Sequence, residues 1–511
     1  MQYEQLLNWN TITILILLGG VSKLAFDYLF RGRRGPYPPG PPPKWFIGNM
    51  FDFPTSNASE VYAAWGRRYN SDILHASSLG NHVMILNNYQ DAEELLDRRA
   101  AKYSDRPVLP IVNLMGWDKL FALFPHGDYW LRHRIVCKKN FGQGAVKNHY
   151  PVQLQKVHDL LRGLLDTPND LFQHIQLLTI SVPMMSMYGY DVKSVDDPCI
   201  NAANQTTLIG GGLLLPGATF INVLPFLRHV PAWFPGASAR KLAEEAKRYA
   251  EDAERIPMEH VEKCMADGTA FPSLVSDFLE KKYAVGATEE EERIIKNVAY
   301  TIYGGSSDTT MSSSETFFYL MATHPEVQRK AREEIDRVIG SKRLPDFEDR
   351  DSLPYVEAIY REVMRWNPPL PMAGPHRVAE DDWYKGYFVP KDTVVLVNLW
   401  AMSHNEDIYP EPNVFRPERH LNEDGTLAAS SDISVVYGFG RRVCPGMYMG
   451  SSMMWLIIVS VLASFDIGNA KDANGKDIEI DHEYVNLGLT SRKKQFKCSF
   501  RPRSSTAQLL M

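Results

Sequence analysis

A single cysteine lies in a glycine-rich turn near the C-terminal end of the chain. The run Tyr437–Gly446 reads Tyr-Gly-Phe-Gly-Arg-Arg-Val-Cys-Pro-Gly, so Arg442 stands two residues before Cys444. Glycines let the backbone approach a flat macrocycle, and backbone N–H groups can then point at the sulfur. An arginine at this spacing can neutralise a haem propionate. The pattern therefore favours Cys444 as the thiolate ligand of a haem iron over the commoner buried, inert cysteine.

An acid and an alcohol follow small residues in a second run, Gly304–Thr310, which reads Gly-Gly-Ser-Ser-Asp-Thr-Thr. Dioxygen bound to iron must be protonated before its O–O bond breaks, and Asp308 with Thr309 could relay those protons. The preceding small residues leave room for oxygen and water. Taken alone, the run is equally consistent with a polar turn of an ordinary helix. We interpret Asp308 and Thr309 as catalytic residues.

A long helix is predicted to carry this acid–alcohol pair. Thr288 and Glu291 have the spacing of a capping box, apolar residues then recur on one helical face, and Pro325 closes the segment. Its roughly 35 residues would span about 50 Å. A helix of that length should cross the whole domain.

Shorter elements of both kinds surround the long helix. Helix-like and strand-like stretches alternate between residues 60 and 100, and the chain then looks mainly helical up to about residue 365. Short strand-like runs follow Pro375, for example at 387–390 and 393–398. We therefore expect one α+β unit, predominantly α-helical with small β-sheets, as the catalytic domain over residues 44–511.

Composition and charge exclude several classes of partner. The chain has 511 residues and a formal net charge of −6, which argues against nucleic acid as a partner. Its five cysteines are scattered, with no CxxC pair and no zinc spacing, so a reducing compartment is favoured over a disulfide framework. No GxGxxG fingerprint follows a strand-like run, so electrons from a dinucleotide would have to come through another protein.

The Cys444 turn resembles the haem-binding loop of the cytochrome P450 family of haem-thiolate monooxygenases, whose pattern is Phe-Gly-x-Gly-x-Arg-x-Cys-x-Gly. Tyr437 stands where the family usually has Phe, which keeps the aromatic ring and adds a hydroxyl. The acid–alcohol run resembles the family's Ala/Gly-Gly-x-Asp/Glu-Thr-Thr element, with Ser306 in place of the second Gly. The overall pattern resembles fungal members involved in secondary metabolism. The resemblance implies the cytochrome P450 fold and a haem b whose axial ligand is the Cys444 thiolate.

Further motifs follow the family's order along the chain. Glu362-Val-Met-Arg365 and the later Phe415–His420 run match its Glu-x-x-Arg helix and Pro-Glu-Arg element, which implies a buried structural network of Glu362, Arg365 and Arg419. Trp130-Leu-Arg-His-Arg134 resembles the Trp-x-x-x-Arg helix that contacts haem propionates, and His376 occupies the position of another propionate donor. The resemblance thus assigns five cofactor-binding residues: Trp130, Arg134, His376, Arg442 and Cys444.

An apolar segment leads the chain. Residues 11–30 are just long enough to cross a bilayer core of roughly 30 Å, although Lys23 and Asp27 fall inside them. Arginines follow directly and no basic residue precedes, so the positive-inside rule places the rest of the chain in the cytosol. We expect residues 1–30 to form a retained single-pass anchor in the endoplasmic reticulum membrane, followed by a basic and proline-rich hinge at 31–43. A cleaved signal peptide is the alternative, but its basic n-region is missing.

The resemblance implies a membrane-anchored monooxygenase. It would insert one oxygen atom from O2 into a lipophilic small molecule, such as a terpenoid or other secondary metabolite. Electrons from NADPH would arrive through a separate flavoprotein reductase, with cytochrome b5 as a second donor. One alternative is a haem-thiolate isomerase or dehydratase that needs no O2, and Asp308-Thr309 argues against it. A second alternative is a non-catalytic haem-binding sensor.

Apolar segments are expected to form the substrate pocket and a second membrane contact. Predicted pocket linings are 107–124, 208–223, Tyr303, 369–373 and 485–489, all dominated by large apolar side chains. Trp233 and Phe234 lie between prolines in a predicted loop, where they could reach the headgroup level of a bilayer. The alternative is that both rings pack into the core.

Overall fold

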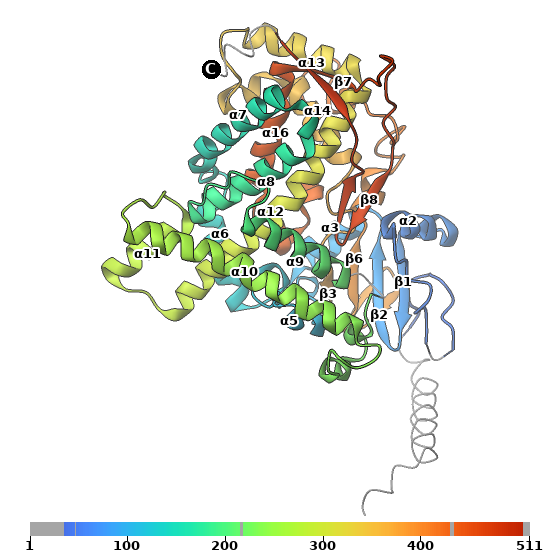
Figure 1. Cartoon of the computed structure of the whole chain (residues 1–511). Helices are drawn as coiled ribbons and strands as arrows, with labels where there is room; N and C mark the ends of the chain where they lie inside the picture. Colours follow the sequence, from blue (N-terminus) through green and yellow to red (C-terminus); the bar gives the residue numbers. More distant parts are fainter. Residues whose placement is uncertain (1–34, 46, 215–217, 430–433, 504–511) are drawn as a thin grey trace, which may run out of the picture.

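The computed structural model describes residues 35–45, 47–214, 218–429 and 434–503. Helices make up most of this part of the chain and surround one long central helix, with small sheets to the right in Figure 1. The predicted α+β fold, predominantly α-helical with small sheets, is confirmed. The predicted anchor, residues 1–30, lies outside the described residues.

Fifteen α-helices lie within the described residues. They are α2 (Ala58–Tyr69), α3 (Tyr89–Glu93), α4 (Ala100–Tyr103), α5 (Pro110–Leu114), α6 (Asp128–Phe141), α7 (Tyr150–Asp166), α8 (Leu171–Tyr188), α9 (Pro198–Leu214), α10 (Ser238–Ala266), α11 (Leu274–Val285), α12 (Glu289–Thr323), α13 (Pro325–Val338), α14 (Pro354–Trp366), α15 (Leu399–Ser403) and α16 (Met447–Ser464).

Four small sheets accompany the helices. The largest has the strand order β1-β2-β6-β3, formed by β1 (Ile73–Ser78), β2 (Asn81–Leu86), β6 (Val394–Val397) and β3 (His376–Arg377). In it β2 runs parallel to β6, and the other two pairs are antiparallel. The two-stranded sheets are β4 (Asp382–Tyr384) with β5 (Tyr387–Val389), β7 (Phe465–Asn469) with β10 (Cys498–Pro502), and β8 (Tyr484–Leu487) with β9 (Thr490–Lys493). The strand-like runs predicted after Pro375 correspond to β5 and β6.

The central helix is α12, which begins and ends where the sequence predicts. The Thr288 hydroxyl accepts a hydrogen bond from the Glu291 amide at 3.2 Å, and the Glu291 carboxylate accepts one from the Thr288 amide at 2.8 Å. These two bonds form the expected capping box. The helix has 35 residues and stops just before Pro325, whose ring and missing N–H end it. It passes through the middle of the molecule in Figure 1.

Helix α16 forms the centre of the largest apolar core. Trp455, Leu456 and Ile457 are fully buried, together with most of the helix. Among the described residues α16 alone has the length and hydropathy of a membrane span. Because it is largely buried in the protein, we assign it to the core, where an all-round apolar helix is expected.

The proline-rich segment at the start of the described chain lies against the sheets. The His75 amide donates to the Pro39 carbonyl and the Phe388 amide to the Pro36 carbonyl, both at 2.9 Å. The Tyr37 ring stacks on the His75 ring, with centroids 4.6 Å apart. From Gly35 to Pro43 the segment forms neither helix nor strand, as expected for a polyproline-like chain. The remainder of the predicted hinge, residues 31–34, lies outside the described residues.

Candidate active site

The Cys444 turn is a tight loop directly before α16. The Cys444 amide donates to the Tyr437 carbonyl at 2.8 Å. Gly440 has a φ of +53°, and a Cβ there would lie 2.2 Å from the Leu96 carbonyl oxygen, so only glycine fits. The Cys444 side chain is exposed, yet enough protein surrounds it that desolvation raises the pKa of its thiol. The sulfur therefore lies on the wall of an interior space rather than on the outer surface.

Two groups favour the thiolate form of Cys444. The Gly446 amide hydrogen-bonds to it, and the positive charge of Arg134 lies near; both lower the pKa of the thiol against desolvation. An iron ion at the sulfur would add a stronger stabilisation, because thiolate rather than thiol is the ligand. None of the five cysteines forms a disulfide, as the scattered spacing predicted.

Arg442 lies beside the turn with an unsatisfied donor. Its guanidinium stacks over the Trp130 ring at 4.2 Å and donates to the Ser104 and Phe124 carbonyls at 2.7 and 2.8 Å. Its Nη1 is buried without a hydrogen-bond partner in the part of the chain that the structure describes. Burial and the neighbouring charge of Arg106 lower the pKa of Arg442 to about 9. A buried donor in this state calls for an anion.

Arg134 and His376 lie in the same region. The Arg134 guanidinium carbon lies 5.8 Å from the Trp130 ring centroid, and its Nη1 donates to the Val443 carbonyl at 2.8 Å. The His376 Nδ1 lies 2.8 Å from the Tyr103 carbonyl, which makes Nδ1 the protonated nitrogen because a carbonyl only accepts. Burial and the Arg106 charge lower the pKa of His376 to about 3. The ring is therefore neutral unless an anion binds to it.

Sequence reasoning missed Arg106. Its Nη1 donates to the carbonyls of Gly374, at 2.8 Å, and of Pro375, directly before His376. Burial lowers its pKa to about 10, and its charge lowers the pKa values of both Arg442 and His376. The surrounding Ser-Asp-Arg-Pro run carried no pattern that we could interpret. Arg106, Arg134, Arg442 and His376 together fit a group with two carboxylates, as the two propionates of haem are.

One turn of helix α12, at the predicted acid–alcohol pair, is less buried than the rest of its interior. The helix is almost wholly buried from Asn297 to Tyr303 and from Thr310 to Ala322, but Gly305 between these stretches is exposed. A Cβ on Gly304 or Gly305 would meet no atom within 4 Å. Open space beside the interior of a buried helix is where a flat cofactor or a substrate can lie.

Asp308 and Thr309 have distinct surroundings on that turn. The Thr309 hydroxyl donates to the Gly305 carbonyl at 2.8 Å. Its hydrogen is therefore in use, and the Thr309 hydroxyl oxygen can accept a hydrogen bond from another donor. Burial raises the pKa of Asp308, and the Arg492 charge opposes this. Within the described residues no hydrogen bond to the Asp308 carboxyl is found. A carboxyl with a raised pKa can hold a proton and release it.

The two chemical segments lie near one crossing of helices. The Ser314 hydroxyl of α12 lies 3.5 Å from the Met454 sulfur of α16. Thr309 precedes Ser314 by five residues and α16 starts seven residues before Met454. At 1.5 Å per residue both segments lie within about 10 Å, along their helices, of the same contact. The fold thus brings the Cys444 turn and the Asp308–Thr309 pair toward one contact, although Asp308 and Cys444 are 136 positions apart in the sequence.

The predicted structural network is present as a set of buried ion pairs. Glu362 receives hydrogen bonds from Arg365 at 2.8 and 2.9 Å and from Arg419 at 3.0 Å. The His420 Nε2 lies 2.9 Å from its other oxygen and was not predicted. Desolvation would raise the pKa of Glu362, but the bonds from His420 and Arg365 outweigh it and bring the pKa to about 2. Arg365 also donates to the Ser403 and Pro412 carbonyls, which ties α14 to the following loops.

Some side chains that were predicted to line the pocket are exposed, and one of them is buried. Leu208, Val485 and Leu489 are 53, 42 and 36% exposed, so these apolar side chains face open space. Tyr303 is different. It is 1% exposed and its hydroxyl donates to the Cys199 carbonyl at 2.9 Å, so it belongs to the core and its prediction as a pocket residue is wrong. A helix position alone did not reveal which face Tyr303 occupies.

Comparisons with known proteins agree with this geometry. The family model described as Cytochrome P450 matches residues 38–499. Cytochrome P450 monooxygenase 208 of Postia placenta is 38% identical over 508 residues, which cover 97% of each protein.

Two further fungal relatives cover nearly the whole chain. Cytochrome P450 monooxygenase ple1 of Rhodocybe pseudopiperita is 37% identical over 474 residues, or 92% of this chain and 90% of the relative. Tryptamine 4-monooxygenase of Psilocybe cyanescens is 35% identical over 502 residues, or 96% of this chain and 98% of the relative. These matches agree with the Cys444 turn and with the basic cluster of Arg106, Arg134, Arg442 and His376. The chain belongs to the cytochrome P450 family and is a monooxygenase of small molecules.

Proposed function

We propose that this monooxygenase inserts one oxygen atom from O2 into a lipophilic small molecule, a terpenoid or another secondary metabolite. The observation that carries the proposal is the accessible Cys444 sulfur beside the unsatisfied Arg442 guanidinium. Haem b, held by these residues, would supply the activation of dioxygen. Trp130, Arg134, His376 and Arg106 would hold its propionates, so that the protein fixes the plane of the cofactor.

The chain's own part in the chemistry is to deliver protons. Asp308 is the proton donor, because burial raises the pKa of its carboxyl and it lies on the open turn of α12. Thr309 would orient water with its hydroxyl, whose hydrogen is already committed to the Gly305 carbonyl. An isomerase or dehydratase has less need of this pair. We therefore favour monooxygenation in this chain, with electrons from NADPH through a separate flavoprotein reductase and cytochrome b5.

The exposed apolar side chains support a lipophilic substrate. Leu208, Val485 and Leu489 come from α9 and from the β8–β9 hairpin, two of the predicted pocket linings. One relative is named for tryptamine, an indole with a basic side chain. Indole amines are therefore included with terpenes among the candidate substrates.

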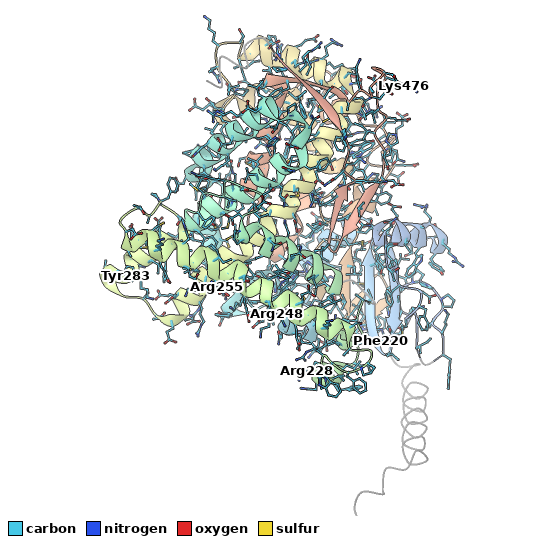
Figure 2. The ribbon with its side chains drawn as sticks, viewed as in Figure 1. Phe220, Arg228, Arg248, Arg255, Tyr283 and Lys476 are labelled. Carbon is cyan, nitrogen blue, oxygen red and sulfur yellow. The ribbon has the colours of Figure 1, made fainter. Side chains whose placement is uncertain are left out.

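We further propose that the protein acts at the endoplasmic reticulum membrane with its body in the cytosol. Trp233 is 80% and Phe234 52% exposed, which excludes the alternative that both rings pack into the core. Phe220 and Phe226 are also more than half exposed. Figure 2 shows Phe220 and Arg228 at the lower end of the view, where the described chain also begins. An anchor at 1–30 and this loop region would then face the same bilayer.

Reconstitution with a reductase tests the proposal. Haem-loaded protein in vesicles is mixed with NADPH–flavoprotein reductase, and terpenes and indole amines are screened for a shift of the haem absorption band on binding. A hit should be converted to a product heavier by one oxygen atom, with label from 18O2. Turnover without NADPH and O2 would instead identify an isomerase or dehydratase. Binding without any turnover would identify a haem sensor.

A further inference from the structure

Helix α9 contains three consecutive glycines, Gly210, Gly211 and Gly212, which weaken the interior of a helix. Two of them have a packing reason. A Cβ on Gly210 would lie 2.4 Å from the Trp117 ring, and one on Gly211 would lie 3.3 Å from the Gly488 Cα. A Cβ on Gly212 would meet no atom within 4 Å. The first two glycines therefore let α9 approach neighbours that side chains would hold away.

The contact between Gly211 and Gly488 joins two walls of the proposed pocket through backbone atoms. Gly488 lies in the turn of the β8–β9 hairpin, with a φ of +65°. A Cβ on it would lie 2.7 Å from the Gly211 Cα and carbonyl carbon. Neither position can take a side chain without separating the two elements. In Figure 1 the hairpin, red, descends toward α9, green.

Each wall is held in place by bonds on its far side. The hairpin is fixed at Ser491, which receives the Ser312 hydroxyl at 2.5 Å and donates through its amide to the Pro369 carbonyl at 3.0 Å. Helix α9 is fixed at Thr206, whose hydroxyl receives the Trp117 indole N–H at 2.9 Å and donates to the Ala246 carbonyl of α10 at 3.3 Å. The Gly211–Gly488 contact itself depends on dispersion alone. No side chain of either glycine ties the two walls together at this point.

Exposed apolar side chains flank this contact. Leu208 precedes Gly211 by one helical turn, and Val485 and Leu489 flank Gly488 on the hairpin. Apolar surface is thus available on α9 and on the hairpin, on both sides of the contact.

We propose that Gly211 and Gly488 form a backbone latch over the substrate pocket, and that Gly211 is a specificity-determining position which limits the entry of bulky ligands. This inference rests on the proposed function, because it takes α9 and the hairpin as walls of the haem pocket. A side chain at position 211 holds the latch open. Bulky ligands then enter faster, while small ligands, which pass a closed latch, are unaffected.

Two iron ligands of different size test the latch. Imidazole and clotrimazole bind ferric haem through the same ring nitrogen, and stopped-flow absorption gives their association rates. The variants are Gly211→Ala and Gly211→Val, with Gly212→Ala and Gly212→Val as matched controls on the same helix. Hydrogen–deuterium exchange of residues 484–490 in the haem-loaded protein gives a second readout that needs no ligand.

We expect clotrimazole to bind about tenfold faster to Gly211→Val, equal to about 1.4 kcal/mol, and imidazole to change less than about twofold. Gly211→Ala should lie between the wild type and Gly211→Val, and exchange of the hairpin should rise in the same order. Equal acceleration in the Gly212 variants, or an unchanged ratio of the two rates in both Gly211 variants, would overturn the latch. The wild type distinguishes a failure of the latch from a failure of the proposed function. If the chain held no thiolate-ligated haem, the wild type itself would show neither the azole shift nor the carbon monoxide band.

Discussion

Replacing Glu362 by Gln should remove a large part of the stability of the fold. Glu362 is fully buried, and the guanidinium of Arg365, itself 1% exposed, depends on it for two hydrogen bonds. A carboxyl whose pKa falls from 4.5 to about 2 on folding contributes roughly 3 kcal/mol as carboxylate. Breaking a buried pair and leaving one charge unpaired costs about 3–5 kcal/mol. The two estimates agree, so we expect Glu362→Gln to lose about 3–5 kcal/mol.

Urea unfolding of the haem-loaded protein measures this loss. With a slope of about 3 kcal/mol per molar urea, the midpoint should fall by roughly 1 to 1.7 M. The haem band and tryptophan fluorescence both follow the transition. Glu333→Gln is the control. It removes an ion pair with Arg329 in which both side chains are more than half exposed, and such pairs contribute less than about 1 kcal/mol. If the two variants unfold within 0.3 M of each other (about 1 kcal/mol at that slope), the Glu362 network does not stabilise the fold as argued.

The same pKa predicts how the stability of the wild type depends on pH. Because folding lowers the pKa of Glu362, its contribution is complete above the unfolded value of 4.5 and is lost as pH falls from 4.5 toward about 2. The difference between the wild type and Glu362→Gln should therefore be constant at neutral pH and shrink below pH 4.5. Burial lowers the pKa of His420 below its usual 6.5, so a difference that already shrinks as pH falls from 6.5 to 4.5 would point to His420 and would contradict the assignment to the carboxyl.

Three further outcomes are expected. Cys444→Ala should lose the absorption band of thiolate-ligated haem with carbon monoxide, and a retained band would exclude Cys444 as the ligand. Thr309→Ala should keep its haem while the peroxide released per NADPH rises; an unchanged product yield would refute its part in proton delivery. A chain without residues 1–35 should still bind vesicles, and Trp233→Ser with Phe234→Ser should abolish this binding without loss of haem. Full solubility of the truncated chain before those substitutions would exclude the second membrane contact.

Local patterns in the sequence predicted the elements that carry the chemistry. The capping box of Thr288 with Glu291 and the proline at 325 fix both ends of α12, since each acts over only a few residues. The glycines around Cys444 are likewise required by nearby backbone, as Gly440 against Leu96 shows. Features of this kind can be recognised because the cause and its effect lie close together in the chain.

Several features that depend on distant contacts were not predicted. Arg106 joins the basic cluster of Arg134, Arg442 and His376 only because its loop folds against Gly374 and Pro375, nearly 270 positions later in the sequence. His420 joins the Glu362 network from the residue next to Arg419, where no spacing rule marks it. Tyr303 is predicted to line the pocket, but its hydroxyl donates to the Cys199 carbonyl in the core. Which face of a helix is open is decided by its neighbours and not by its own sequence.

We infer that one part of the structure holds the cofactor rigidly and that another part varies with the substrate. Buried charges and hydrogen bonds fix the first part through the Glu362 network and the groups around Arg442. The apolar helix α16 packs in its core. The second part consists of α9 and the β8–β9 hairpin, which meet at Gly211 and Gly488 without side chains. Substitutions there change the shape of the pocket and leave the iron ligand untouched. One reaction can thus serve many substrates on this fold, and differences in substrate among relatives should follow the residues of α9 and the hairpin more closely than those of the basic cluster.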